Sequence, residues 1–341
     1  MNPDQRGPGE RAEPLLVVED LRVVFDTDRG RAITIDGLSF EVHEGETLGV
    51  VGESGSGKSM TSLAILGLLP AAAQVSGSIR FRGRELLTMT DDEMRELRGN
   101  QIALVFQDAL AALNPVMTVG AQLAEAVSVH HPEISRSELR RRAIELLQLV
   151  GIPSAETRVG QYPHEFSGGM RQRVDIAMAV ANDPVLLIAD EPTTALDVTV
   201  QAQILDVLRT VQERTGTTVM LVTHDLGVIA GSADRVLVMY AGNKVEEASV
   251  EQTFYETAHP YTRGLLASLP RMDRRSRDER LFQIAGQPPA ATALPSGCRF
   301  GPRCPSFRED PCAGSVPLPE LVGAEHVAAC HRLADLREES A

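Results

Sequence analysis

Short hydrophobic runs alternate with longer amphipathic segments through most of the chain. The runs are four or five residues long, rich in Val, Ile and Leu, and bounded by polar or turn-forming residues, which is typical of strands. The predicted strands cover residues 15–18, 21–25, 39–42, 47–51, 102–106, 185–189, 219–223 and 236–240. The run at 185–189 is apolar throughout, which predicts a strand buried on both faces. Strands separated by helices predict an α/β fold around a mostly parallel sheet.

The stretch from residue 92 to about 181 differs, because helical signals dominate it. Its clearest helix covers residues 137–150 and is expected to end at Gly151 and Pro153. We therefore expect a helical subdomain inserted in an α/β unit that spans residues 15–257. Residues 1–14 are polar and are expected to form a disordered lead-in, and residues 258–341 form a smaller C-terminal extension.

The segment from Gly52 to Ser59 has the glycines, lysine and hydroxyl residue of a phosphate-binding P-loop. It lies between the strand at 47–51 and a helix expected at 60–69, so the core is predicted to be a P-loop NTPase rather than to contain a chance glycine turn. Backbone N–H groups of such a loop surround an anion, and the helix N-terminus adds positive charge. The residues expected around the phosphates are Gly52, Ser54, Gly55, Ser56, Gly57, Lys58, Ser59 and Met60.

Asp190 and Glu191 directly follow the apolar strand predicted at 185–189. In open α/β sheets, ligands bind beyond the carboxyl ends of the strands. Asp190 can hold Mg²⁺ there together with the Ser59 hydroxyl, and Glu191 can orient an attacking water. Carboxylates are common at strand ends, but a P-loop in the same chain favours the functional interpretation.

Three other features have an ordinary structural explanation when each is taken alone. Ser167, Gly168 and Gly169 open a predicted helix, where they can form a second anion site or Ser167 can simply cap the helix. His224 follows the strand at 219–223, where it can contact a γ-phosphate or be structural. Gln107, after the strand at 102–106, carries no functional signal by itself.

The order and spacing of all these features resemble those of ABC-type ATPases. The shared features are the P-loop, Gln107, the segment 167–172, the segment 185–191, Ala195-Leu196-Asp197 and His224, within residues 15–243. The resemblance implies a head-to-tail dimer in which each ATP lies between the P-loop of one subunit and the Ser-Gly-Gly loop of the other. Two anion-binding loops in one chain fit this arrangement.

The same resemblance implies a role for each conserved position of the motif set. Gln107 would sense Mg²⁺ and the attacking water, Glu191 would be the general base, and His224 would contact the γ-phosphate. Asp197 would bridge the dimer. Phe166 and Met170 depart from the commonest residues of the signature loop, but Ser167 and Gly169, which would face phosphate, are present.

Longer segments resemble one branch of the family, the oligopeptide/dipeptide importers, which also contains nickel and glutathione importers. The segments are 52–59, 105–115, 166–174, 259–266 and 297–305. This resemblance implies a second, usually distinct ATPase subunit, two membrane permease subunits and, indirectly, an extracytoplasmic solute-binding protein. Gln107 and residues 108–115 would form part of the groove that receives the permeases. Nickel, glutathione or another small solute remains an alternative cargo to peptides.

All four cysteines, Cys298, Cys304, Cys312 and Cys330, lie in the C-terminal extension. A cytosolic protein rarely keeps disulfides, so tetrathiolate ligation of an iron–sulfur cluster or of zinc is the physical alternative to free thiols. The spacings of five, seven and seventeen residues lack the tight knuckles typical of zinc sites. The resemblance implies a [4Fe–4S] cluster, with Zn²⁺ as the alternative.

Composition narrows the functional classes further. The net charge of −14 argues against binding along a nucleic-acid backbone. No apolar run approaches the roughly 20 residues that span a bilayer, and no signal-peptide core precedes the first strand. We therefore expect a peripheral ATPase at the cytoplasmic face of a membrane. A soluble, non-transport ABC ATPase and a non-catalytic nucleotide-binding subunit are the alternatives.

Overall fold

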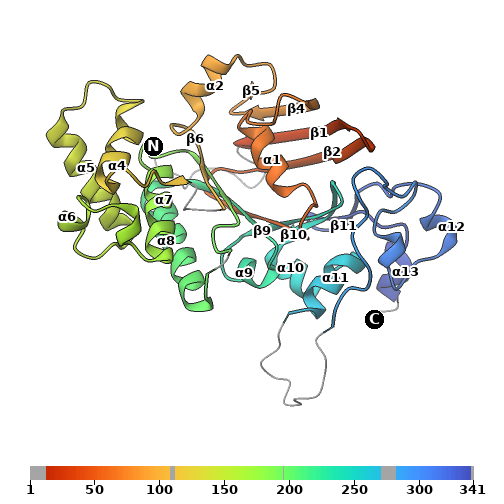
Figure 1. Ribbon diagram of the computed structural model, residues 1–341. Helices are drawn as coiled ribbons and strands as arrows, with labels where there is room; N and C mark the ends of the chain where they lie inside the picture. Colours follow the sequence, from red (N-terminus) through yellow and green to blue (C-terminus); the bar gives the residue numbers. More distant parts are fainter. Residues whose placement is uncertain (1–12, 108–111, 195, 270–281, 339–341) are drawn as a thin grey trace, which may run out of the picture.

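The chain forms two β-sheets with helices packed around them (Figure 1). A computed structural model describes residues 13–107, 112–194, 196–269 and 282–338. The larger sheet has eight strands in the order β11-β12-β10-β9-β3-β8-β7-β6, and the smaller has four in the order β2-β1-β4-β5. The predicted α/β class is therefore confirmed.

The smaller sheet is antiparallel and forms one edge of the molecule. Its strands are β1 (Leu16–Thr27), β2 (Gly30–Val42), β4 (Ala73–Phe81) and β5 (Arg84–Glu85). The prediction of two separate strands at 15–18 and 21–25 is wrong, because both belong to β1. A bulge at Glu19 and Asp20 interrupts the pairing register, and Asp20 has a positive φ of 45°. Because Glu19 and Asp20 are polar, the sequence of this single strand looks like two strands joined by a turn.

The larger sheet is parallel at its centre, as predicted. The parallel strands are β3 (Thr47–Val51), β6 (Ile102–Val105), β7 (Leu186–Asp190), β8 (Thr218–Thr223) and β9 (Arg235–Tyr240). All residues of β3 and β8 are buried, because hydrophobic clusters cover both faces of the sheet. The carboxyl ends of these strands consequently lie at one edge of the sheet, where ligands bind in such folds.

Most of the helices in the predicted helical region form one group at the side of this sheet (Figure 1). The region contains α2 (Asp91–Leu97), α4 (Val119–Ser128), α5 (Arg136–Leu149), α6 (Ala155–Arg158), η1 (Pro163–Glu165) and α7 (Gly168–Ala179). Thr118 and Ser135 cap α4 and α5 through side-chain oxygens. Strand β6 also lies within residues 92–181, but it pairs with β7 in the main sheet.

The other helices before the four-cysteine segment lie outside this helical region. They are α1 (Lys58–Ile65), α8 (Val198–Thr215), α9 (Leu226–Ile229), α10 (Val250–Tyr255) and α11 (Pro260–Ala267). Helix α1 begins two residues before the predicted start and ends four residues before the predicted end. In the parts of the chain that the structure describes, no helix is both long and apolar enough to cross a bilayer.

The C-terminal extension continues the main sheet. It contains η2 (Gly301–Arg303), α12 (Glu309–Cys312), β11 (Glu320–Gly323), β12 (His326–Ala328) and α13 (Leu333–Glu338). Strand β12 pairs with β10 (Asn243–Ser249). The fully buried Glu246 of β10 accepts hydrogen bonds from the backbone N–H groups of Ala258 and His259 and lies 2.8 Å from His326 Nε2. This buried network ties the extension to the core.

Candidate functional site

The P-loop connects the carboxyl end of β3 to the first residue of α1. Gly55 and Gly57 have φ values of 79° and 103°, which favour glycine. A Cβ atom at Gly52 would lie 2.2 Å from the Met239 carbonyl oxygen, so no side chain fits there. Gly57 is the N-cap residue of α1 and provides no side-chain cap, which leaves the first N–H groups of the helix available to an anion.

Lys58 is buried inside this loop, with 4% of its surface exposed. Its Nζ donates to the carbonyl oxygens of Gly52, at 2.8 Å, and Glu53, at 3.1 Å. Burial lowers the pKa of Lys58, and the nearby carboxylates of Glu191 and Asp190 oppose that shift. The buried Ser56 hydroxyl has no hydrogen-bond partner among the described residues. A bound phosphate would supply the missing partner and a counter-charge, so the loop fits the phosphates of a nucleotide.

Ser59 and Asp190 meet from opposite sides of the site. The Ser59 hydroxyl donates to Asp190 Oδ1 at 3.1 Å. Burial raises the pKa of Asp190, the Ser59 hydrogen bond lowers it, and the neighbouring Glu191 raises it. A hydroxyl and a carboxylate are oxygen ligands of the kind that Mg²⁺ prefers, so this pair fits the predicted magnesium position.

Three side chains converge on one oxygen of Glu191. Gln107 Nε2 donates to Glu191 Oε2 at 3.1 Å, Thr194 Oγ1 donates to it at 2.8 Å, and His224 Nδ1 lies 3.3 Å away. Glu191 has a positive φ of 49°, an uncommon conformation for a residue with a side chain. The sequence predicted Gln107, Glu191 and His224 as site residues, and the structure brings them together. It did not predict Thr194, a common residue type with no motif of its own.

The Ser167 loop belongs to a different cluster. The Ser167 hydroxyl accepts from the Met170 N–H and caps α7, and a Cβ atom at Gly169 would lie 2.5 Å from Val200 of α8. Asp197 caps α8 by accepting from the Val200 N–H at 3.0 Å. Among the described contacts, none connects Ser167, Gly168, Gly169 or Asp197 to the P-loop, and Ala195 lies outside the described residues. Within one chain, therefore, Ser167 and Asp197 act as helix caps, and Gly168 and Gly169 form the first turn of α7.

The predicted partner-facing segment after Gln107 is described only from residue 112. Leu113 is 4% exposed and belongs to the hydrophobic core, so its side chain packs inside this chain. Val116 is 79% exposed, and Phe106 on the other side of the segment is 49% exposed. Residues 108–111 lie outside the described residues.

Asp175 lies on the buried side of α7, below Gln107. The Phe106 N–H donates to Asp175 Oδ2 at 3.2 Å, and the carboxyl is 3% exposed. Burial raises the pKa of Asp175 from 3.8 to about 7, although the hydrogen bond from Phe106 lowers it. The sequence analysis missed this residue, since its partner lies 69 residues away.

The four cysteines line one cavity in the C-terminal extension, together with His259, Phe300 and other residues. All four are free thiols, and burial raises the pKa values of Cys298 and Cys330, and that of Cys304 to about 11. Within the described ranges, however, no group of three or more His, Cys, Asp or Glu side chains has the arrangement of a formed metal site. The convergence of four soft ligands fits tetrathiolate binding, but the [4Fe–4S] expectation has no further support from this geometry.

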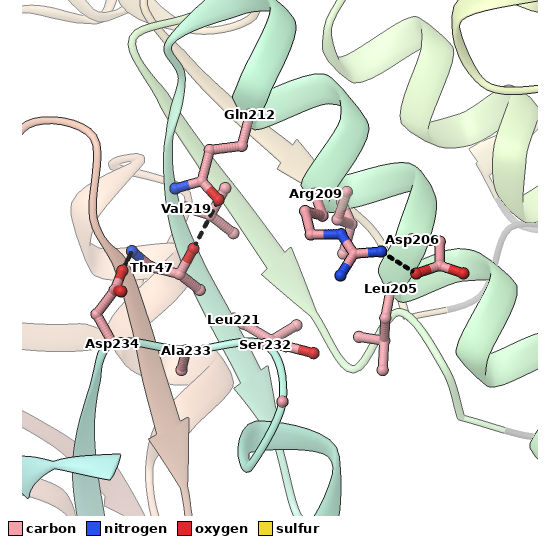
Figure 2. A pocket seen from close by; sticks show the side chains of 12 residues that line it. Thr47, Leu205, Asp206, Arg209, Gln212, Val219, Leu221, Ser232, Ala233 and Asp234 are labelled. Carbon is pink, nitrogen blue, oxygen red and sulfur yellow. Dashed lines mark hydrogen bonds and ion pairs between the residues drawn. The ribbon is translucent and has the colours of Figure 1, made fainter. Parts of the chain in front are cut away.

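A separate pocket lies between α8 and the strands of the main sheet (Figure 2). It is lined by Thr47 and Val219, near the amino ends of β3 and β8, so it lies at the edge opposite to the P-loop. Its polar groups pair with one another: Thr47 Oγ1 donates to Gln212 Oε1, and the Thr47 N–H donates to Asp234. This pocket contains none of the predicted catalytic residues.

Two family models match the chain. The model described as "ABC transporter" matches residues 35–194, and the model described as "Oligopeptide/dipeptide transporter, C-terminal region" matches residues 245–312. The second match covers the start of the extension and three of its cysteines.

Several relatives are similar over most of this chain. The oligopeptide transport ATP-binding protein OppD of Mycobacterium tuberculosis is 53% identical over 94% of this chain, which spans about half (52%) of that relative. OppD of Escherichia coli is 48% identical, covering 92% of this chain and 91% of the relative. The dipeptide transport ATP-binding protein DppD of Bacillus subtilis is 47% identical, covering 96% and 97%.

Solved structures of ATP-binding cassettes are also similar. The dimeric, post-hydrolysis structure of the cassette MJ0796 bound to ADP and Pi has a TM-score of 0.62 and 27% identity, covering 69% of this chain and 98% of the cassette. The structure of cbiO1 from Clostridium perfringens has a TM-score of 0.61 and 26% identity, covering 72% and 93%.

The raised pKa of Asp175 predicts a pH-dependent stability. The native state keeps a proton on Asp175 between about pH 4 and pH 7, where the unfolded chain has released it, so this contribution to stability falls progressively over that range and is lost above about pH 7. Asp175→Asn keeps an oxygen acceptor for Phe106 but carries no charge. We expect its stability advantage over the parent to grow by roughly 3 kcal/mol between about pH 5 and about pH 8, in urea unfolding.

Asp183→Asn is the matched control, because the Asp183 side chain is 59% exposed and pairs with Arg142 at the surface. The difference in unfolding free energy between Asp183→Asn and the parent should change little between about pH 5 and about pH 8. If Asp175→Asn differed from the parent by the same unfolding free energy at both pH values, the titration could not be assigned to Asp175.

Proposed function

The chain belongs to the oligopeptide/dipeptide group of ABC transporter ATP-binding proteins, and we propose that it binds and hydrolyses ATP to drive the import of peptides across a membrane. The observation that carries this proposal is the meeting of Lys58, Ser59, Asp190 and the Gln107–Glu191–His224 group at one edge of the sheet. The ATPase unit is proposed to cover residues 15–257, and the extension residues 258–341.

Each group at this edge has a distinct task in the proposed reaction. The P-loop N–H groups and Lys58 hold the phosphates of ATP. Ser59, Asp190 and Gln107 would hold Mg²⁺, which would supply positive charge to the phosphates when bound. Glu191 accepts the proton of the attacking water, and Gln107 and Thr194, which hydrogen-bond to its Oε2 oxygen, fix the direction of that carboxylate. His224 lies beside the same oxygen, 55% exposed and able to contact the γ-phosphate.

The Ser167 loop and Asp197 support a dimer. Neither contacts the P-loop of its own chain, yet the loop presents glycines and a helix N-terminus at the surface of α7. We infer that Ser167, Gly168 and Gly169 complete the ATP site of a second ATPase subunit, with Asp197 at the contact between the two. A related but distinct chain is the favoured partner, and the similar cassette MJ0796 is described as dimeric.

Two membrane permease subunits are the further proposed partners, with this chain as a peripheral protein at the cytoplasmic face. The exposed Phe106 directly precedes Gln107, so a permease contact at Phe106 would lie close to the Glu191 group, and the exposed Val116 follows nine residues after Gln107. An extracytoplasmic solute-binding protein would deliver the cargo. Peptides are favoured because the printed names of the relatives specify oligopeptide or dipeptide transport, and nickel or glutathione is the alternative.

We further propose that Cys298, Cys304, Cys312 and Cys330 bind a metal centre, a [4Fe–4S] cluster in preference to Zn²⁺. The shared cavity supports this, because four thiols from separate segments line one enclosed space. The raised pKa values show that burial favours the neutral thiols, so a cation would have to stabilise the thiolates. When bound, the centre would cross-link these segments.

The Glu191 assignment predicts a separation of binding from hydrolysis. Glu191→Gln keeps the size of the side chain but cannot accept a proton, so ATP should bind while turnover of the assembled transporter falls by about 100-fold or more. Lys58→Ala should instead weaken ATP binding. Glu213→Gln is the matched control, since Glu213 is exposed on α8. Hydrolysis by Glu191→Gln at the parental rate, measured as phosphate release, would refute the base assignment.

The cysteine cavity predicts metal in protein purified without oxygen. We expect about four irons per chain and broad absorption near roughly 400 nm, both lost when any of the four cysteines is changed to serine. Metal analysis measures the iron content, and absorption spectroscopy measures the band. Stoichiometric zinc without iron would select the zinc alternative, and a metal-free chain with four reactive thiols would exclude both.

The partner proposal predicts position-specific cross-linking. A photo-reactive amino acid at Val116 should capture a permease subunit in membranes that contain the assembled transporter, and one at Val198, which is 82% exposed beside Asp197, should capture the second ATPase. The control position is Leu318, 78% exposed on the extension, which should capture neither. Capture of the same protein from all three positions would contradict the assigned surfaces.

A further inference from the structure

Glu53, the second residue of the P-loop, is held by groups from the C-terminal extension. Its backbone N–H donates to the Tyr261 hydroxyl at 2.9 Å. Its carboxylate forms a two-point ion pair with Arg303, at 2.7 and 3.1 Å. Arg303 lies 250 residues from Glu53 along the sequence and has a side chain only 5% exposed. The remaining polar group of Glu53, its carbonyl oxygen, accepts from Lys58 Nζ and the Ser56 N–H.

Arg303 is fixed in place by further contacts. Its Nε donates to the Ala285 carbonyl oxygen at 2.9 Å, Nη1 donates to the Tyr240 hydroxyl at 3.2 Å, and the guanidinium lies 5.7 Å from the centre of the Tyr240 ring. A buried, two-point guanidinium–carboxylate pair specifies direction as well as distance. A movement of the segment that contains Arg303 would therefore move Glu53 as well.

That segment also forms a wall of the four-cysteine cavity. Arg303 precedes Cys304, and Phe300 lines the cavity. The Phe300 ring packs against the rings of Tyr240, at 5.3 Å, and Tyr261, at 5.4 Å. An uninterrupted series of packed groups thus leads from the cysteines to Glu53.

We propose that Arg303 is a positioning residue for the nucleotide site, which makes the phosphate-binding shape of the P-loop depend on the folded four-cysteine segment. The inference rests on the proposed function, since it concerns the same ATP site. A glycine-rich loop has few side chains to fix its conformation, and Glu53 supplies one of them. Because the Glu53 carbonyl oxygen accepts from Lys58 Nζ, a shift of Glu53 would displace both the loop and the lysine.

Three substitutions test the positioning role. Arg303→Met and Glu53→Gln each remove the ion pair from one side, and both should weaken ATP binding on the order of tenfold, measured by equilibrium titration with a fluorescent ATP analogue. Arg303→Lys keeps a charge but not the two-point geometry and should give an intermediate affinity. Arg308→Met is the control, because Arg308 lies in the same segment, 58% exposed, with its ion pair to Asp335 at the surface.

The dependence on the cysteine segment is tested by combining variants. Cys304→Ser should weaken ATP binding in the parent chain, but little further in Glu53→Gln, because the Arg303–Glu53 ion pair, the side-chain connection to the P-loop, is already broken. Glu53→Gln changes no residue of the extension, and its amide oxygen can still accept a hydrogen bond from Arg303, so all four cysteines and their neighbours are retained in this variant. All titrations are made well below the unfolding temperature of each variant, where a purely structural loss would leave the affinity of the folded protein unchanged.

Two results would overturn the inference in distinguishable ways. A parent chain that does not bind ATP would overturn both the proposed function and this inference. A parent that binds ATP, together with unchanged affinity in Arg303→Met and Glu53→Gln or additive losses with Cys304→Ser, would overturn the inference alone.

Discussion

The parallel pairing of β3, β7 and β8 is the constraint on which the site depends. Each strand ends beside its neighbour, with Val51 opposite Thr223 and Asp190 opposite Val222, so the residues that follow them share one edge. A slip of the pairing by one residue would exchange the side chains that these buried strands pack into the hydrophobic clusters on the two faces of the sheet. The same register that buries the core therefore sets the distance between the P-loop and Glu191.

The local parts of the site could be predicted from sequence because each is contained in a short segment. The P-loop, the acid pair after an apolar strand and the capping serine all have signals within about ten residues. Thr194, Asp175 and Arg303 have no such signal, since each matters through a partner that only the folded chain brings close. Arg303 meets Glu53 across 250 residues, and Asp175 meets Phe106 across 69. No spacing rule could have selected these side chains.

The strands likewise divide into those that have a local sequence signal and those that do not. The parallel strands were predicted because hydrophobic runs buried on both faces are distinctive. Strand β1 was divided in two because Glu19 and Asp20 look like a turn, although the chain passes through them as a bulge. Strands β11 and β12 were not predicted, since they are short and lie among prolines and polar residues. Their pairing with β10, rather than their own sequence, makes them strands.

The attachment of β12 to β10 has a consequence for biogenesis. The ribosome adds Glu246 to the chain eighty residues before it adds His326. Until then, the edge of the main sheet at β10 is unpaired, and Glu246 has no histidine partner. Unpaired strand edges favour association with other chains. The unfinished polypeptide is thus exposed to aggregation until the ribosome has released the segment that completes the sheet, and a truncation before residue 326 would make that exposure permanent.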